Sequence, residues 1–377
     1  MKRHLCLLGD ANSVHLQRWA QEMLARGWRV SVVTARPAPI DGVEQRVLAP
    51  VQRQTDWLWR VSAARRHVQD LAPDIVHAHY VTSYGTLAAR CGRRPLVMTA
   101  WGSDLLVTPR QSALLRWLTG WTLRQADLVT GDSQDLVEAI DAYGPRRPAV
   151  RIHWGADTAR FHPAPWAAKA GFGIASLRAW DENYRIQVIV AALGRLLQAA
   201  PEAPVHLHLL GGGPREAELR AQVRTLGLQD QVTFHGRVGD AEMQAVLAQC
   251  KVSVSVPLSD ATSVAMLESM ACGLPVLASD LPANREWLGD NEGLWVPAAG
   301  RDSDADAALA AAVLALWRDD ARAQRLGERN LARIRHDGRR ETQMDAMAAW
   351  YRRLLAEAGR EGRKGLEGRR ATGRGGR

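Results

Sequence analysis

The sequence has few cysteines and no long apolar run. Its four cysteines are scattered, mostly among apolar residues and without metal-ligand spacing: Cys6, Cys91, Cys250 and Cys272. This pattern predicts reduced core residues in a cytoplasmic protein. No run approaches the roughly 20 apolar residues that a membrane-spanning helix needs, and the first apolar stretch, at 5–8, is too short for a signal peptide and predicts a strand. We therefore expect a cytoplasmic protein whose membrane contact, if it has any, is peripheral.

Two recognisable site patterns are also missing. No strand is followed by a GxGxxG turn and a helix, which disfavours a nicotinamide-dependent dehydrogenase. His77 and His79 lie on the same face of a predicted strand end, but no third ligand of matching geometry is nearby. We expect no metal site and no cofactor.

The basic charge is concentrated at the end of the chain. From Gly359 onward, seven basic and two acidic residues contribute +5 of the formal net charge of +9. This segment is Gly-rich and almost without apolar side chains, which predicts a disordered basic tail over 359–377. The rest of the chain is only mildly basic, so we expect no specific nucleic-acid partner.

Short β-branched apolar runs alternate with helical patterns throughout, and no internal repeat or low-complexity segment precedes the tail. This alternation is typical of parallel α/β sheets, and 377 residues favour two domains. The predicted strands are 4–8, 29–34, 44–48, 75–79, 96–100, 127–130, 149–153, 172–176, 205–210, 232–235, 252–256, 275–279 and 293–297. We expect two doubly wound, Rossmann-like domains at 1–160 and 170–338 that face each other across a cleft, a linker at 161–166 and a last helix at 340–357.

Glu268 is the most unusual residue of the second half. In a helix, its same-face neighbours would be Val264, Ala265, Ala271 and Cys272, all small or apolar. Such a Glu is either a solvated residue on a rotated helix or a ligand-binding carboxylate held in a cleft, and the apolar neighbours favour the second interpretation.

Several other candidates lie at predicted strand ends of the second half. Arg178 follows one strand, where its guanidinium could clamp a diphosphate or form a surface ion pair. Gly211 and Gly213 follow another, where glycine permits close approach to a ligand or a tight turn. Thr262 and Ser263 precede the Glu268 helix, either as part of an anion site or as a helix cap.

The first half has its own candidates at strand ends. The loop from Gly9 to His15 is small and polar and opens a helix, so its backbone amides could meet an anion or a hydroxyl. His79 ends a strand and is a candidate hydrogen-bonding group, whereas His77 is expected to be a satisfied core histidine. Asp104, after Trp101, looks exposed.

Together these residues resemble the retaining, nucleotide-sugar-dependent glycosyltransferases of family 4 ("group 1"), which have the GT-B fold. The resemblance covers the chain except its tail. The family's acidic-x7-Glu signature is matched by Asp260 to Glu268, followed by Ser269-Met270-Ala271-Cys272-Gly273-Leu274-Pro275-Val276. Supporting matches are 152–161 for "NGVDxxxF", 211–214 for "GxGP" and 289–296 for "GxNGxLV".

The resemblance implies roles for these residues. Glu268 would bind the ribose hydroxyls, and Asp260 the donor-sugar hydroxyls. The amides of Thr262, Ser263 and Val264 would meet the distal phosphate. Arg178 would neutralise the diphosphate, and the Gly9 loop would approach the reacting sugar. The last helix would cross back onto the first domain.

Three departures from the family pattern stand out. Asp260 replaces the usual Glu. Trp101 stands where the family has a histidine, so His79 or Asp104 would have to cover part of that role. The lysine expected about five residues after Arg178 is absent, which leaves Arg185 as the nearby cation.

The implied activity is metal-independent transfer of a hexose, with retention, from a nucleoside-diphosphate-sugar to a hydroxyl of a glycan or lipid-linked acceptor in cell-surface polysaccharide or glycolipid synthesis. Asp260, Arg178 and His79 are the expected catalytic group, and His15, Trp101 and Asp104 the acceptor side. The alternatives are a GT-B epimerase or phosphorylase, or a non-catalytic subunit that binds sugar nucleotides.

Two segments rich in Trp and Arg bear on the acceptor. They are 53–66 and 110–124, and either could rest on an anionic membrane. The spacing of Leu114, Trp117, Leu118 and Trp121 also fits a buried helix face, and we expect burial.

Overall fold

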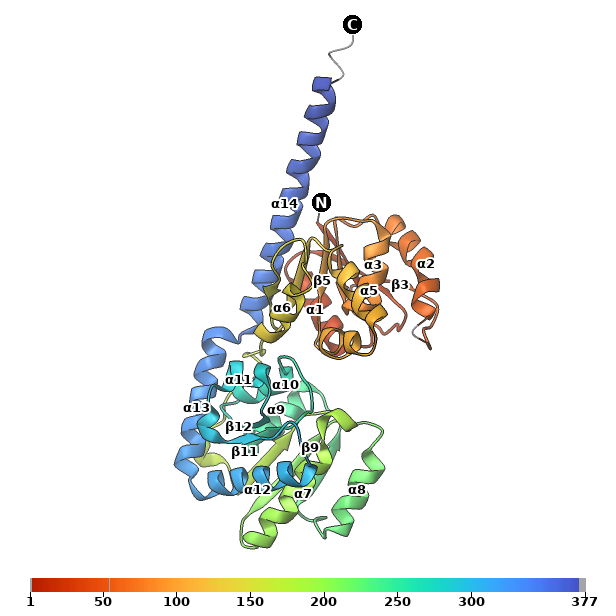
Figure 1. Ribbon diagram of the computed structural model, residues 1–377. Helices are drawn as coiled ribbons and strands as arrows, with labels where there is room; N and C mark the ends of the chain where they lie inside the picture. Colours follow the sequence, from red (N-terminus) through yellow and green to blue (C-terminus); the bar gives the residue numbers. More distant parts are fainter. Residues whose placement is uncertain (1, 54, 373–377) are drawn as a thin grey trace. The chain divides into compact units, whose positions relative to one another are not determined.

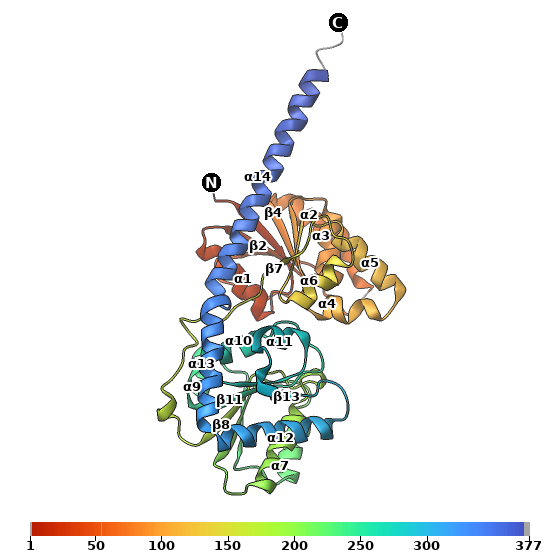
Figure 2. The same ribbon diagram turned by 60° about the vertical axis from the view of Figure 1, so that its left-hand side comes forward.

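The computed structural model describes residues 2–53 and 55–372. The chain forms two compact units: unit 1 is built from residues up to 152 and from 344 onward, and unit 2 from 153–343. Each unit is a twisted sheet with helices on both faces (Figures 1 and 2). The predicted fold class, two doubly wound parallel-sheet domains, is confirmed.

Unit 1 contains a seven-stranded sheet in the order β3-β2-β1-β4-β5-β6-β7, with every neighbouring pair parallel. Its strands are β1 (His4–Leu8), β2 (Arg29–Thr34), β3 (Glu44–Val47), β4 (Ile75–His79), β5 (Leu96–Thr99), β6 (Leu128–Gly131) and β7 (Val150–Arg151). Its helices are α1 (Val14–Ala25), α2 (Asp56–Leu71), α3 (Thr86–Cys91), α4 (Ser103–Leu106), α5 (Ala113–Leu123), α6 (Gln134–Asp141) and most of α14 (Arg340–Thr372).

Unit 2 contains a six-stranded parallel sheet in the order β10-β9-β8-β11-β12-β13. Its strands are β8 (Phe172–Ser176), β9 (Val205–Leu210), β10 (Val232–Gly236), β11 (Cys250–Ser255), β12 (Val276–Ser279) and β13 (Trp295–Val296). Its helices are α7 (Ile186–Ala199), α8 (Glu216–Thr225), α9 (Asp240–Gln249), α10 (Val264–Ala271), α11 (Pro282–Leu288), α12 (Asp302–Arg318) and α13 (Asp320–Asp337).

The strand orders decide where ligands can bind. β1 and β4 are buried at every residue, as expected of central strands covered on both faces. The order of the chain reverses between β1 and β4 in unit 1 and between β8 and β11 in unit 2. In doubly wound sheets, ligands bind beyond the carboxyl ends of the strands at this reversal.

The boundary between the units lies earlier than the expected end of the first domain at residue 160. Residues 153–156 are buried, and Ala156 and Phe161 belong to a hydrophobic cluster of unit 2. A parallel bridge also joins Ala156 to Arg339. The segment 161–166, which its two prolines marked as a linker, is therefore inside unit 2.

The last helix docks on unit 1 through Tyr351, which is fully buried. Its hydroxyl accepts the Trp19 indole N–H at 3.0 Å and is hydrogen-bonded to Nδ1 of His77 at 2.5 Å. α14 continues to Thr372, beyond the expected end at 357. Residues 359–372, expected to be a disordered tail, therefore continue the helix. The rest of the expected disordered tail, 373–377, lies outside the described residues.

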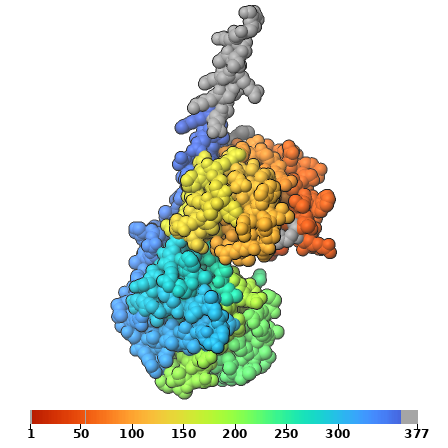
Figure 3. All heavy atoms as spheres, viewed as in Figure 1, coloured from red at the N-terminus to blue at the C-terminus, as the bar shows by residue number. Residues whose placement is uncertain are grey.

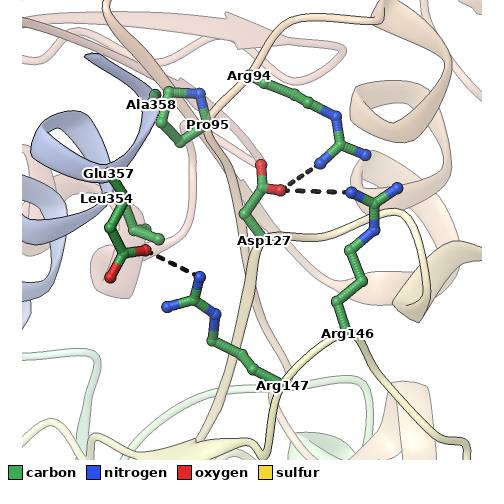
Figure 4. Close-up of a pocket in the computed structure, with 8 residues that line it drawn as sticks. All are labelled: Arg94, Pro95, Asp127, Arg146, Arg147, Leu354, Glu357 and Ala358. Atoms are coloured by element: carbon green, nitrogen blue, oxygen red, sulfur yellow. Dashed lines mark hydrogen bonds and ion pairs between the residues drawn. The ribbon is translucent and has the colours of Figure 1, made fainter. Parts of the chain in front are cut away.

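A second contact of α14 closes a pocket of about 320 Å³ at the amino ends of β5 and β6 (Figure 4). Arg147 binds Glu357 of α14 at 3.0 Å, while Arg94 and Arg146 both pair with Asp127. Each guanidinium therefore faces a carboxylate of unit 1, and the Arg147–Glu357 pair favours a role for Arg147 in docking the helix.

The expected burial of the α5 face is wrong for two of its four residues. Leu114 and Trp117 are 71% and 61% exposed, whereas Leu118 and Trp121 are half-buried. Leu58 and Trp59 at the start of α2 are also exposed, at 57% and 77%. Helix α5 instead packs through Thr119, Gly120, Thr122 and Leu123 in its second half.

Two expectations from composition can be compared with the structure. All four cysteines are buried and free, as predicted for reduced core residues. Within 2–53 and 55–372, no helix combines the length and apolar character that crossing a bilayer requires.

Candidate functional site

The loops after β8 and β11 bring three candidate residues of unit 2 together. Arg178 is 8% exposed; one of its guanidinium nitrogens lies 2.7 Å from the Asp260 carboxylate, and another donates to the Ser263 hydroxyl. Because β8 and β11 are the adjacent strands at the reversal of chain order, residues 82 positions apart in sequence meet here. The result is a preorganised cation at the carboxyl end of the sheet.

Two residues that follow Arg178 support this cluster. The Tyr184 ring lies 4.1 Å from the Arg178 guanidinium carbon, a cation–π contact. The Asn183 side chain donates to the Ser259 carbonyl at 3.0 Å and accepts the Ser259 N–H at 3.2 Å. These are the positions where the absent lysine was expected, and here they hold Arg178 and the Asp260 loop in place.

The carboxyl group of Asp260 is largely withdrawn from water. Burial raises its pKa, and the Arg178 guanidinium opposes that rise. A buried carboxylate stays charged only when a cation or hydrogen-bond donors compensate it. Arg178 therefore helps to keep the Asp260 carboxylate charged, and Asp260 in turn orients the Arg178 guanidinium.

Helix α10 begins directly after this cluster. Ser263 is its N-cap, with the hydroxyl accepting the Met266 N–H at 3.3 Å. The Thr262 hydroxyl accepts the Trp287 indole N–H at 3.3 Å. Ser263 therefore caps the helix, which is one of its two predicted roles, and its hydroxyl also accepts from Arg178. The first-turn amides, starting at Val264, carry the partial positive charge of a helix N-terminus.

Glu268 lies in the core side of α10 and is 3% exposed. Its Oε1 is 3.8 Å from a guanidinium nitrogen of Arg340, which is 5% exposed. Another nitrogen of the same guanidinium donates to Asp157 at 3.2 Å. The solvated-surface interpretation of Glu268 is therefore wrong, because the side chain is buried within an ion-pair network.

Arg185 does not lie at the surface of the cluster, where a replacement for the missing lysine would be needed. It is 1% exposed and donates to the carbonyls of Val256 at 2.8 Å and Pro297 at 2.9 Å, and to the Ser279 hydroxyl. These contacts tie the ends of β11, β12 and β13 together. Its geometry supports a structural role in place of the expected donor contact.

The glycines after β9 are required by packing against the Arg178 loop. A Cβ on Gly211 would lie 2.2 Å from the Arg178 carbonyl oxygen, and one on Gly213 would lie 2.4 Å from that of Trp180. The Trp180 N–H donates to Gly212 at 3.1 Å. Gly211 and Gly213 therefore let one loop support the other, which favours the tight-turn interpretation over direct approach to a ligand.

In unit 1, His79 ends β4 and is 2% exposed. Neither ring nitrogen has a hydrogen-bond partner among the described residues. Burial lowers the pKa of His79 to about 3, so the ring is neutral near pH 7. Its ring stacks on Trp101 at 5.6 Å, and Trp101 stacks in turn on the half-buried His15 at 5.1 Å. The three expected residues therefore form one aromatic stack.

The remaining unit 1 candidates, and His77, make close contacts within the unit. His77 is hydrogen-bonded to Tyr351 and to Thr99 at 2.7 Å, as expected of a satisfied core histidine. Asp104 is 1% exposed rather than exposed, because its carboxylate accepts the backbone N–H groups of Val81 and Trp101 at 2.8 and 2.9 Å. A Cβ on Gly9 would lie 2.5 Å from Cδ1 of Leu16, so Gly9 packs closely against α1.

The structure thus brings Arg178, Asp260 and Ser263 together, and separately stacks His79, Trp101 and His15. Sequence reasoning missed Arg340 as a neighbour of Glu268. The only local signal was Asp157 within the 152–161 motif, and its partner is 183 residues away.

Both halves of the chain match families of glycosyltransferases. Residues 4–133 match the family described as "Glycosyl transferase 4-like", and residues 172–319 match "Glycosyl transferases group 1". A phosphatidyl-myo-inositol mannosyltransferase of Mycobacterium leprae is 29% identical over 335 residues, which cover 81% of this chain and 83% of the relative. An N-acetyl-alpha-D-glucosaminyl L-malate synthase of Bacillus anthracis is 24% identical, covering 55% of this chain and 56% of its own.

Solved structures show the same fold. A sucrose-phosphate synthase from Thermosynechococcus elongatus superposes with a TM-score of 0.77 at 19% identity, over 94% of this chain and all of that one. The Anabaena protein HepE, solved in complex with UDP, gives a TM-score of 0.75 at 17% identity, over 93% of this chain and all of its own.

Proposed function

We propose that this chain, which is a family 4 glycosyltransferase with the GT-B fold, transfers a hexose from a nucleoside-diphosphate-sugar to an acceptor hydroxyl with retention and without a metal. The observation that carries the proposal is the meeting of Arg178, Asp260 and the start of α10 at the carboxyl end of the unit 2 sheet. HepE was solved with UDP and with UDP-glucose, which supports a nucleotide-sugar donor.

The chemistry of transfer explains why a cation is placed here. The bond to the leaving phosphate breaks through an oxocarbenium-like state, and negative charge grows on the β-phosphate oxygen. Arg178 and the first amides of α10 are fixed positive groups that would stabilise this oxygen. Asp260, bound to the same guanidinium, would accept hydrogen bonds from the hydroxyls of the donor sugar. Glu268 would accept hydrogen bonds from the hydroxyls of the ribose.

We assign the acceptor to the aromatic stack of unit 1. His79 is neutral and buried, and neither ring nitrogen has a partner within residues 2–53 and 55–372, so it can both donate to and accept from a sugar hydroxyl. Trp101, in the position where the family has a histidine, offers an aromatic face for the apolar face of a sugar ring.

The first test is a panel of nucleotide-sugars, incubated with the purified chain with no acceptor. We expect one donor to stabilise the protein against heat, slow release of its nucleoside diphosphate, and an unchanged rate after a chelator is added. With an acceptor, NMR of the product should show the anomeric configuration of the donor. Binding without hydrolysis or transfer would instead support a non-catalytic subunit. Isomerisation of the donor would support an epimerase, and release of the sugar that depends on added phosphate would support a phosphorylase.

We further propose a lipid-linked acceptor and peripheral contact with an anionic membrane. In the sequence, the exposed Leu58 and Trp59 follow Arg53, and the exposed Leu114 and Trp117 follow Arg110 and flank Arg116. Both segments belong to unit 1 and lie at its surface (orange tones in Figure 3). Apolar side chains flanked by cations suit the boundary between acyl chains and anionic headgroups.

Flotation with vesicles tests this contact. The chain should float with vesicles that contain anionic phosphatidylglycerol and remain at the bottom with phosphatidylcholine alone. Replacing Trp59 and Trp117 by Ser should abolish flotation while donor hydrolysis stays unchanged. No flotation with anionic vesicles would contradict the proposal.

A further inference from the structure

Arg340 is a buried cation between two carboxylates of unit 2. Its side chain is 6% exposed, and that of Glu268 is 4% exposed. One guanidinium nitrogen donates to Asp157 at 3.2 Å, and another lies 3.8 Å from Glu268. This second contact is an ion pair that is longer than a hydrogen bond. Arg340 therefore compensates the Glu268 charge electrostatically.

The backbone fixes Arg340 in this position. The Arg340 N–H donates to the Ala156 carbonyl at 3.0 Å, and the Ala156 N–H donates to Gly338 at 2.7 Å. Gly155 has φ +67°, and a Cβ there would lie 2.5 Å from the backbone nitrogen of Arg340. The motif at 152–161 thus fixes Arg340 at two points. Gly155 permits the close approach of the Arg340 backbone, and Asp157 binds the guanidinium.

The physical need for such a residue follows from burial. A carboxylate that is removed from water is costly unless a cation or hydrogen-bond donors compensate it, and a long flexible side chain has no fixed direction on its own. Glu268 has apolar neighbours on α10, including Leu267 and Ala271, which cannot orient a charge. The fixed guanidinium of Arg340 can do so.

We propose that Arg340 is a positioning residue for Glu268: held by Asp157 and the Ala156 backbone, it keeps the Glu268 carboxylate charged and oriented to accept the ribose hydroxyls of the donor. This inference rests on the proposed function, in which Glu268 binds the ribose. It gives the 152–161 motif a role in donor recognition although the motif itself need not touch the donor.

The test compares nucleoside diphosphates that differ only in the ribose hydroxyls. Dissociation constants of UDP, GDP and ADP, and of their 2′,3′-dideoxy counterparts, are measured by calorimetry for the wild type. For the base that binds, the ribose form should bind at least about tenfold more tightly, because a site built to bind hydroxyls rejects the analogue that lacks them. In Arg340→Gln this preference should fall below about threefold, and in Arg340→Lys it should be intermediate.

The preference separates positioning from mere destabilisation, which would weaken both forms equally. Arg322→Gln is the matched control, because Arg322 also pairs with a carboxylate of unit 2, Glu292 at 2.8 Å; it should keep the wild-type preference. If Arg340→Gln does not fold, Arg340→Lys and Asp157→Asn carry the test, each with a reduced preference expected.

The outcomes distinguish the inference from the proposed function. An undiminished ribose preference in Arg340→Gln, or in both milder variants, overturns the role of Arg340 and leaves donor binding intact. A wild type that binds a nucleoside diphosphate without preferring ribose overturns the inference through Glu268. A wild type that binds none of the six compounds contradicts the proposed function itself.

Discussion

Replacing Glu268 by Gln should weaken binding of the donor nucleoside diphosphate by about 100-fold, which corresponds to about 2.7 kcal/mol. The amide has the same shape, but it loses the charge that strengthens hydrogen bonds to ribose hydroxyls. It also leaves the buried Arg340 guanidinium 3.8 Å away with one carboxylate fewer. Both effects act on donor binding, so slow donor hydrolysis should be lost at donor concentrations that saturate the wild type.

Calorimetric titration with the donor found in the panel measures this effect. Glu216→Gln is the control, because Glu216 is a carboxylate of unit 2 whose side chain is 46% exposed and pairs with Arg220 at 2.9 Å. The affinity of Glu216→Gln for the donor should match that of the wild type. Wild-type affinity in Glu268→Gln would show that this carboxylate does not bind the donor.

Replacing Arg178 by Ala should lower kcat by about 10² to 10³, the usual cost of removing one fixed donor from a developing oxyanion. Donor affinity should change less than kcat, because the charge on the β-phosphate oxygen grows only as the bond breaks. The loss also removes the cation beside Asp260, whose pKa is already raised by burial. That pKa should therefore rise further in the variant.

Single-turnover kinetics with saturating donor separate this effect on chemistry from binding. Arg220 provides a close control, because it too pairs with a carboxylate and lies over an aromatic ring, Phe234 at 4.4 Å. Arg220→Ala should keep the wild-type kcat. If Arg178→Ala loses donor affinity and keeps the wild-type kcat at saturating donor, Arg178 acts in binding alone.

The sequence was sufficient for the architecture because parallel strands repeat a local signal. Each predicted strand overlaps an observed one, and β1, β2, β4, β8 and β9 have the expected bounds. Buried strands of a doubly wound sheet are continuous apolar runs, and the chain carries that pattern at each of them. The packing face of α5 was harder, because an apolar spacing does not say which face has a neighbour.

The site was only partly predictable from the sequence, as a comparison of Arg178 with Arg185 shows. Arg178 and Asp260 could be placed at strand ends, and the parallel order brings those ends together. Arg185 and Arg178 are seven residues apart and of one type, yet one binds carbonyls in the core and the other faces Asp260. The difference lies in backbone direction, since Arg185 has φ +48°. Sequence position alone does not contain it.

The docking of α14 also orders events during synthesis on the ribosome. Unit 2 is one continuous stretch, complete once residue 343 has emerged, whereas unit 1 needs residues from both ends of the chain. Until Tyr351 is translated, the hydroxyl that receives the Trp19 indole N–H and meets His77 is missing from the nascent first half. Unit 1, whose first residues are synthesised before unit 2, is therefore the last unit to finish folding, because it is complete only when α14 has been synthesised.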